Sequence, residues 1–159
     1  MRQILYSSQE TVQLSFSDIG NLLVSARKWN SMNNITGLLL HAPNGNFVQL
    51  IEGDAEDVEN VLSRITSDKR HHNISVFIDQ VIEHRAFPDW EMGFADLLCS
   101  DQTKVEQYIR EALRRAPGEL ALQLIPVFLM LSLHDAHADS SLASAFIGVY
   151  QGRRTGVAG

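Results

Sequence analysis

The sequence has little cysteine, little positive charge and no long apolar run, and each shortage excludes a class of protein. The single cysteine, Cys99, rules out an internal disulfide, and no charged-then-apolar leader follows Met1, so we expect a cytoplasmic location. Because 13 Lys and Arg face 19 Asp and Glu, the net charge of -6 disfavours direct binding to nucleic acid or anionic membranes. The longest apolar stretch, Leu124–Leu133, is roughly half the length of a membrane span and contains Pro126.

Motifs that carry catalysis are also missing, so we predict that the protein is not an enzyme. The sequence contains no Gly-rich phosphate loop and no nucleophile elbow. An acylphosphatase-like enzyme would need an Arg-bearing anion loop after the first strand, where residues 8–11 read Ser-Gln-Glu-Thr. His134 and His137 resemble a metal-binding pair, but further ligands are missing, so we interpret them as an exposed helix end and predict no metal site.

Hydrophobic periodicity predicts an α+β domain. Apolar residues at helical spacing follow a capping box at Ser15 and Asp18, and a second such pattern follows Asp54. Gly45 lies in a turn signal between two apolar runs, which predicts a β-hairpin. The strands are predicted at residues 3–7, 35–41, 47–52, 74–83 and 90–94. The resulting order, βαββαββ, predicts a ferredoxin-like sandwich with two helices on one face of the sheet.

The predicted strands are apolar on both faces, so the second face also needs a cover. Leu38, Leu39 and Leu40 are consecutive, which is typical of a strand buried on both sides. Helical patterns after residue 98 can supply this cover. We therefore predict a core at 1–97, a C-terminal helical extension of the same domain at 98–151 and a disordered tail at 152–159.

Three polar residues stand at positions that the pattern places inside. Gln49 lies between Phe47 and Ile51 on one strand face, Asn30 extends the apolar stripe of the first helix, and Tyr6 lies on the first strand. Because a buried amide without a partner costs about 1–3 kcal/mol, these side chains should meet each other or a polar ligand. Each also has an ordinary explanation: core packing for the tyrosine, a helix cap for the asparagine and a backbone bond for the glutamine.

Taken together, a set of motifs resembles the BLUF family, the sensors of blue light using FAD. The resemblance covers Ile4 to Asp96 in order. It is carried by Tyr6, Asn30, residues 35–37 (Ile-Thr-Gly), 47–53 (Phe-Val-Gln-Leu-Ile-Glu-Gly), 68–71 (Asp-Lys-Arg-His) and 87–92 (Phe-Pro-Asp-Trp-Glu-Met).

The resemblance implies a non-covalently bound FAD whose ring lies between the two helices. Ile35 and Ile65 would form apolar walls, Asn30 and Arg70 would meet the polar edge of the ring, and His71 would play a weaker part in the pocket. FMN and riboflavin carry the same ring, and the sequence does not separate them from FAD.

The resemblance also implies the photochemistry. Gln49 would stand between the Tyr6 hydroxyl and the flavin, and it would rearrange or tautomerise after Tyr6 gives an electron and a proton. A shift of the absorption spectrum to the red should result. Rearrangement of Gln49 would change the packing of Met92 and Trp90, and the last strand and the C-terminal helices would carry the output.

Output should reach a partner protein or a homo-oligomer through the C-terminal helices, because few residues follow the predicted core. The alternative from another class is a flavin-free interaction module on the same fold. The chain departs from the common family pattern at Trp29, where a polar residue often precedes the asparagine. Two roles stay open for Trp29: packing beside the helix, or an indole at the ring edge that competes with Tyr6 as an electron donor.

Overall fold

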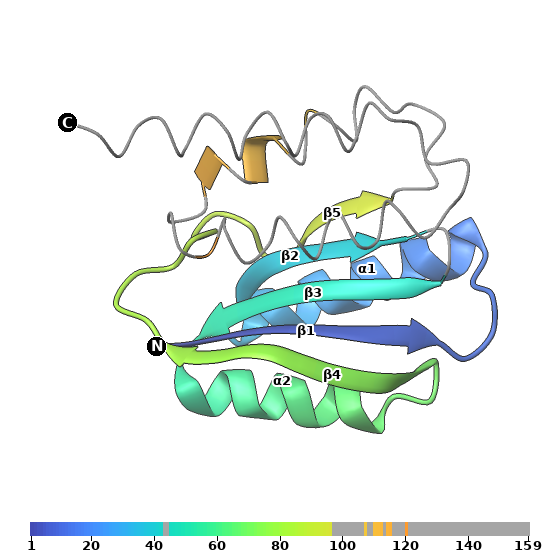
Figure 1. Cartoon of the computed structure of the whole chain (residues 1–159), viewed down its shortest axis with the longest axis horizontal. Helices are drawn as coiled ribbons and strands as arrows, with labels where there is room; N and C mark the ends of the chain where they lie inside the picture. The colour runs from blue at the N-terminus through green and yellow to red at the C-terminus, as the bar shows by residue number, and fades with distance from the viewer. Residues whose placement is uncertain (43–44, 97–106, 108–109, 113, 116–119, 121–159) are drawn as a thin grey trace. The chain divides into compact units, whose positions relative to one another are not determined.

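The elements follow one another in the order βαββαββ, as the sequence predicts. In the computed structural model, which describes residues 1–42, 45–96, 107, 110–112, 114, 115 and 120, helix α1 follows strand β1 and helix α2 follows the hairpin of β2 and β3. The bounds are β1 Arg2–Glu10, α1 Phe16–Met32, β2 Thr36–His41, β3 Asn46–Gly53, α2 Ala55–Ser67, β4 His71–Val81 and β5 Gly93–Asp96 (Figure 1). The predicted α+β class is confirmed.

Local chemistry accounts for the start and the end of α1. The Ser15 side chain accepts from the backbone N–H of Asp18 at 3.2 Å, and the Asp18 carboxylate accepts from the backbone N–H of Ser15 at 3.0 Å. This capping box satisfies two N–H groups that the first helical turn leaves unpaired. At the other end the N–H of Asn33 donates to the Trp29 carbonyl, and Asn34 takes a positive φ of 51° that ends the helix.

The sheet has the strand order β4-β1-β3-β2-β5, which places β1 and β3 side by side in its middle. In the antiparallel register Tyr6 on β1 lies opposite Gln49 on β3, and Gln49 also lies opposite Leu39 on β2. Directly opposed residues of antiparallel strands share a face of the sheet. These three side chains therefore form one row across the sheet.

The helices cover the face that carries this row. One cluster of buried residues joins both helices to the inner strands: Ile4, Tyr6, Ile19, Leu23, Ile35, Leu39, Phe47, Ile51, Val58, Val61 and Met92. Ile19 and Leu23 come from α1, and Val58 and Val61 come from α2. These are positions that the helical periodicity predicts to face the core.

The second face of the sheet is buried as well, with Leu38, Leu40 and Leu50 each no more than 2% exposed. Most of the predicted cover, the extension at 98–151, and the whole tail at 152–159 lie outside the described residues. Within it, residues 107, 110–112, 114, 115 and 120 are helical. Cys99, His134 and His137 also lie outside the described residues.

The chain divides into two compact units, one formed by Met1–His41 with Gly45–Phe94 and one by Ala42–Asn44 with Ala95–Gly159. The first unit holds both described long helices and most of the sheet. No helix in the described part of the chain is long and apolar enough to cross a membrane. The same described residues contain no group of three His, Cys, Asp or Glu side chains that could hold a metal ion.

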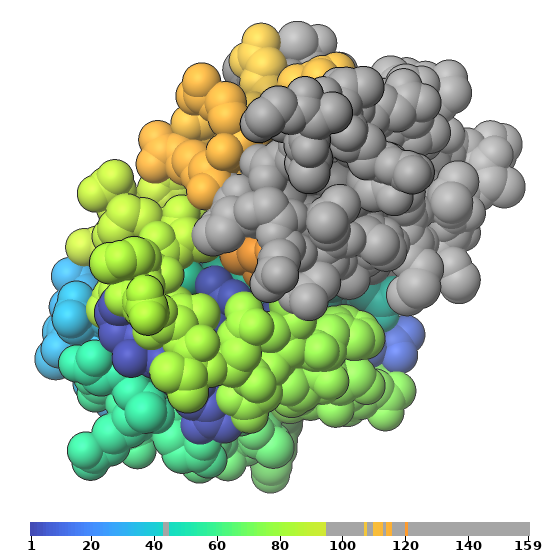
Figure 2. Space-filling model, turned by 60° about the vertical axis from the view of Figure 1, so that its left-hand side comes forward, coloured from blue at the N-terminus to red at the C-terminus, as the bar shows by residue number. Residues whose placement is uncertain are grey.

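Most strand boundaries differ from the prediction by one to three residues; β1, for example, extends to Glu10 instead of ending at Ser7. Strand β4 begins at His71 instead of Ile74, because the backbones of His71 and His72 pair with the far end of β1 regardless of side-chain polarity. The strand predicted at residues 90–94 begins only at Gly93. Figure 2 shows β4 and the loop that follows it at the molecular surface, in green to yellow-green, and most β4 residues are exposed.

Trp90 and Met92 therefore lie in a loop and do not alternate along a strand. The N–H of Trp90 donates to the Phe87 carbonyl at 3.2 Å, and the Trp90 ring stacks on Phe87 with ring centres 5.3 Å apart. The Trp90 carbonyl accepts from the N–H of Gly37 on β2 at 2.8 Å. These contacts keep residue 90 in a turn, and the extended pairing starts only after Met92.

Candidate functional site

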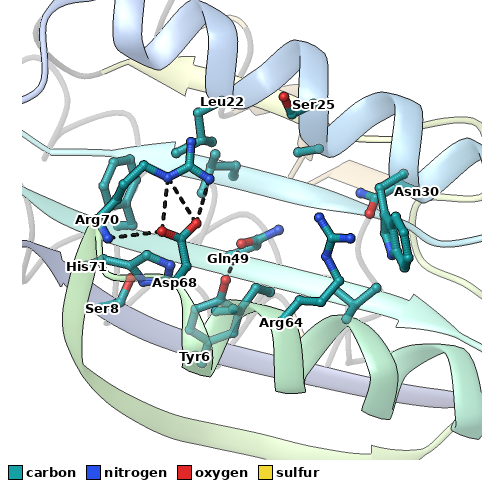
Figure 3. Close-up of a pocket in the computed structure, with 16 residues that line it drawn as sticks. Tyr6, Ser8, Leu22, Ser25, Asn30, Gln49, Arg64, Asp68, Arg70 and His71 are labelled. Atoms are coloured by element: carbon teal, nitrogen blue, oxygen red, sulfur yellow. Dashed lines mark hydrogen bonds and ion pairs between the residues drawn. The ribbon is translucent and has the colours of Figure 1, made fainter.

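A pocket lies between α1 and α2, on the face of the sheet that carries the Tyr6–Gln49 row. The cavity has a volume of about 130 Å³ and is partly open to solvent. Its lining residues come from both helices, from strands β1 to β4 and from the turn after α2: Tyr6, Ser8, Leu22, Ser25, Ala26, Trp29, Asn30, Leu39, Phe47, Gln49, Val61, Arg64, Ile65, Asp68, Arg70 and His71. Arg70, Asp68 and His71 lie at one end, Asn30 and Arg64 at the other, with Tyr6 and Gln49 between (Figure 3).

Tyr6 and Gln49 form the polar centre of the pocket floor. The Tyr6 hydroxyl donates a hydrogen bond to Gln49 Oε1, and the side chains are 2% and 9% exposed respectively. Burial raises the pKa of the Tyr6 phenol far above its ordinary value, and the nearby Asp68 carboxylate adds to the rise. The phenol therefore stays protonated and remains a donor.

The other end of the Gln49 amide reaches Met92. Gln49 Nε2 donates to the Met92 sulfur at 3.6 Å, and Met92 is 2% exposed. Thioether sulfur is a weak acceptor that has no proton to give. One amide thus connects the phenol on β1 with the residue that directly precedes β5.

Helix α1 holds the main chain on both sides of this contact. Asn30, 3% exposed in the last turn, donates through Nδ2 to the Glu91 carbonyl at 2.7 Å. Arg27, one turn earlier, donates through Nε to the Met92 carbonyl at 3.1 Å. Asn30 therefore lines the pocket and also positions the segment that carries Met92.

The opposite end of the pocket carries a charged pair. Asp68 Oδ1 accepts from the backbone N–H of Arg70 at 2.9 Å and from Arg70 Nε at 3.0 Å. The bond to the guanidinium lowers the pKa of the Asp68 carboxyl and raises the pKa of Arg70. Burial lowers the pKa of the neighbouring His71, whose Nδ1 is buried and has no partner among the described residues.

A second cation stands near Asn30. The Arg64 guanidinium carbon on α2 lies 3.8 Å from the centre of the Trp29 ring on α1. The indole nitrogen Nε1 is buried and also has no hydrogen-bond partner among the described residues. Because buried polar groups are nearly always paired, the unpaired atoms of Trp29 and His71 indicate a ligand between the helices.

Most of the residues predicted from the sequence come together here. Tyr6, Asn30, Gln49, Ile65, Arg70 and His71 line the pocket. Met92 does not line it but contacts Gln49. Ile35 is buried in the core cluster next to Gly53, and Trp90 stacks on Phe87, so neither is among the lining residues.

Sequence reasoning assigned no role to Arg64 or Asp68. Arg64 lies on the pocket side of α2 and meets a residue 35 positions earlier, a contact that no local pattern announces. Asp68 carried a readable signal, because an aspartate that bonds the backbone two residues later is a common turn motif.

The fit to a flavin can be judged from these features. Apolar side chains from both helices flank the cavity, polar groups stand at both ends, and two buried polar atoms of its lining lack partners in the described chain. A flat aromatic ring with a polar edge matches this arrangement. The described residues therefore fit the cofactor that the motifs imply.

Comparison with known proteins agrees with the geometry. The family model described as "Sensors of blue-light using FAD" (BLUF) matches residues 1–93. The β subunit of a photoactivated adenylate cyclase from Euglena gracilis is 34% identical over 93 residues, which are 58% of this chain and 11% of that protein.

Solved structures include a bacterial light-regulated adenylyl cyclase, 31% identical with a TM-score of 0.60, covering 71% of this chain and 34% of that one. The dark-state structure of the BLUF protein BlrB is 28% identical with a TM-score of 0.57, covering 77% of this chain and 82% of that one. The motifs, the fold and the family match converge: this chain belongs to the BLUF family, the sensors of blue light that use FAD.

Proposed function

We propose that this protein binds FAD non-covalently between α1 and α2, senses blue light through Tyr6 and Gln49, and signals by protein contact without catalysis of its own. The observation that carries the proposal is the continuous chain from the Tyr6 hydroxyl through the Gln49 amide to the Met92 sulfur. This chain starts at the floor of the pocket and ends directly before β5.

Asn30, Ile65, Arg70 and His71 are the residues we propose to hold the cofactor, as they line the pocket. The bound flavin supplies a ring that absorbs blue light and becomes a strong oxidant when excited. Arg70 is the permanent cation at its end of the pocket, and Asp68 fixes its orientation through the bond to Nε. The half-buried His71, whose lowered pKa favours the neutral imidazole, offers its buried Nδ1 to the ligand.

Tyr6 is the proposed electron and proton donor. Its raised pKa keeps the phenol protonated, and its proton already points at the Gln49 carbonyl oxygen. Once the electron and the proton had both returned to Tyr6, Gln49 would be left rotated or tautomerised. The redox state is restored, and only the hydrogen-bond pattern around Gln49 has changed.

Met92 is the proposed reader of this change. A rotated Gln49 amide presents Oε1 to the Met92 sulfur, which has no proton to donate, so the contact with Nε2 is lost. The main chain of Met92 is held at its carbonyl by Arg27, and the strand β5 begins at the next residue. Repacking of Met92 therefore changes the segment that leads to the C-terminal helices, which we propose to contact a partner protein or a second copy.

Absorption spectroscopy tests the proposal. Purified protein loaded with FAD should shift its flavin spectrum to the red under blue light, without bleaching, and recover in the dark. Gln49→Leu should bind FAD but show no shift, whereas Met92→Leu should keep the shift and lose light-dependent amide exchange in β5. A protein that cannot take up FAD, FMN or riboflavin contradicts the proposal and favours the flavin-free interaction module, and a persistent shift in Gln49→Leu contradicts the role of the amide.

A further inference from the structure

Trp29 places a second oxidisable ring at the pocket. The indole lines the cavity from α1, and its Nε1 is buried without a partner in the described part of the chain. Indole gives up an electron more readily than a protonated phenol does. A tryptophan at this position is therefore a potential competitor of Tyr6.

The competing event would be unproductive. One electron would leave the Trp29 indole, which becomes a radical cation, and pass to the excited flavin. The same electron would then return, and both partners would be restored. Since Gln49 bonds Tyr6 and Met92, and no hydrogen bond joins it to Trp29 in the described part of the chain, no proton would cross the glutamine amide and no red-shifted state would form.

We propose that Arg64 suppresses this competing path by holding a positive charge over the Trp29 ring, so that Tyr6 remains the electron donor. This inference rests on the proposed function. The guanidinium stays charged at any physiological pH, and it pairs with no carboxylate among the described residues. The cation stabilises the neutral ring and repels the positive charge that oxidation would create.

The size of the effect follows from the separation. At 3.8 Å, the repulsion between unit charges in water changes the equilibrium between neutral and oxidised Trp29 by about sixfold. The dielectric constant of water is used because Arg64 is exposed; the half-buried indole increases the effect, and dissolved salt reduces it.

The experiment compares FAD-loaded wild type with Arg64→Leu, Arg64→Lys and the double variant Arg64→Leu/Trp29→Phe. Transient absorption measures the share of oxidised tryptophan against oxidised tyrosine, and steady illumination measures the yield of the red shift. In Arg64→Leu the ratio of oxidised tryptophan to oxidised tyrosine should rise about sixfold, and the yield of the red shift should fall. Arg64→Lys should stay close to wild type, and the double variant should recover the yield.

Two results overturn the inference: an unchanged tryptophan share in Arg64→Leu, or a lost yield that Trp29→Phe does not rescue, which would mean that Arg64 acts only through folding or cofactor binding. A readout without flavin separates this failure from failure of the proposed function. In the given sequence with Trp90→Phe, Trp29 is the one tryptophan left, and pulse radiolysis should find that Arg64→Leu raises the equilibrium constant for its oxidation about sixfold. Absence of any red shift in wild type would instead refute the proposed function.

Discussion

Removal of the Tyr6 hydroxyl tests whether the phenol and Gln49 form one energetic unit. Tyr6→Phe keeps the ring in its core position but leaves Gln49 Oε1 without its donor. Both side chains are buried, at 2% and 9% exposure, so water replaces the bond poorly. An unsatisfied buried group costs about 1–3 kcal/mol, and we expect the free energy of unfolding to fall by that amount.

Gln49→Leu should cost a similar amount, because it leaves the Tyr6 hydroxyl without an acceptor in an apolar environment. The double variant removes both polar groups together, so its loss should be smaller than the sum of the single losses. The double-mutant cycle should therefore return a coupling energy of about 1–3 kcal/mol.

Urea unfolding of flavin-free protein in the dark measures these values, with an unchanged m-value as the sign that only stability has moved. Ser67→Ala serves as a remote control, because Ser67 bonds within α2 at the surface. Its effect should add to that of Tyr6→Phe within about 0.5 kcal/mol. Additive losses for Tyr6→Phe and Gln49→Leu would refute the claim that their hydrogen bond is formed in the folded protein.

Two further predictions concern residues around the site. Glu52 is fully buried and accepts from the backbone N–H groups of Ala86 and Phe87 at 3.0 and 2.6 Å, so Glu52→Gln should lower the free energy of unfolding by about 1–3 kcal/mol in urea titrations. The exposed Glu83→Gln is its control, and equal small effects would contradict the anchoring role. Burial lowers the pKa of His71, so its contribution to stability is present above the ordinary value of 6.5 and is lost as the pH falls through the lowered pKa. His71→Gln should flatten this part of the stability profile, and an unchanged slope would exclude His71 as its source.

The sequence alone determined the order and type of the elements. Helical periodicity and the capping box at Ser15 and Asp18 are local features, and local hydrogen bonding produces them in the structure too. The placement of Gln49 inside the sheet also followed from strand alternation, because Phe47 and Ile51 share its face. Where pairing with a distant strand overrode the local pattern, as at the start of β4, the predicted boundary was wrong.

Only the tertiary structure decided which of these residues meet. The register of β1 on β3 sets Tyr6 opposite Gln49, and the loop before β5 brings Met92 to the far end of the same amide. The contact of Arg64 with Trp29 depends on how two helices lie across one sheet. Packing and strand pairing bring together residues that lie far apart in the chain. The spacing of residues within one helix or strand does not predict such contacts.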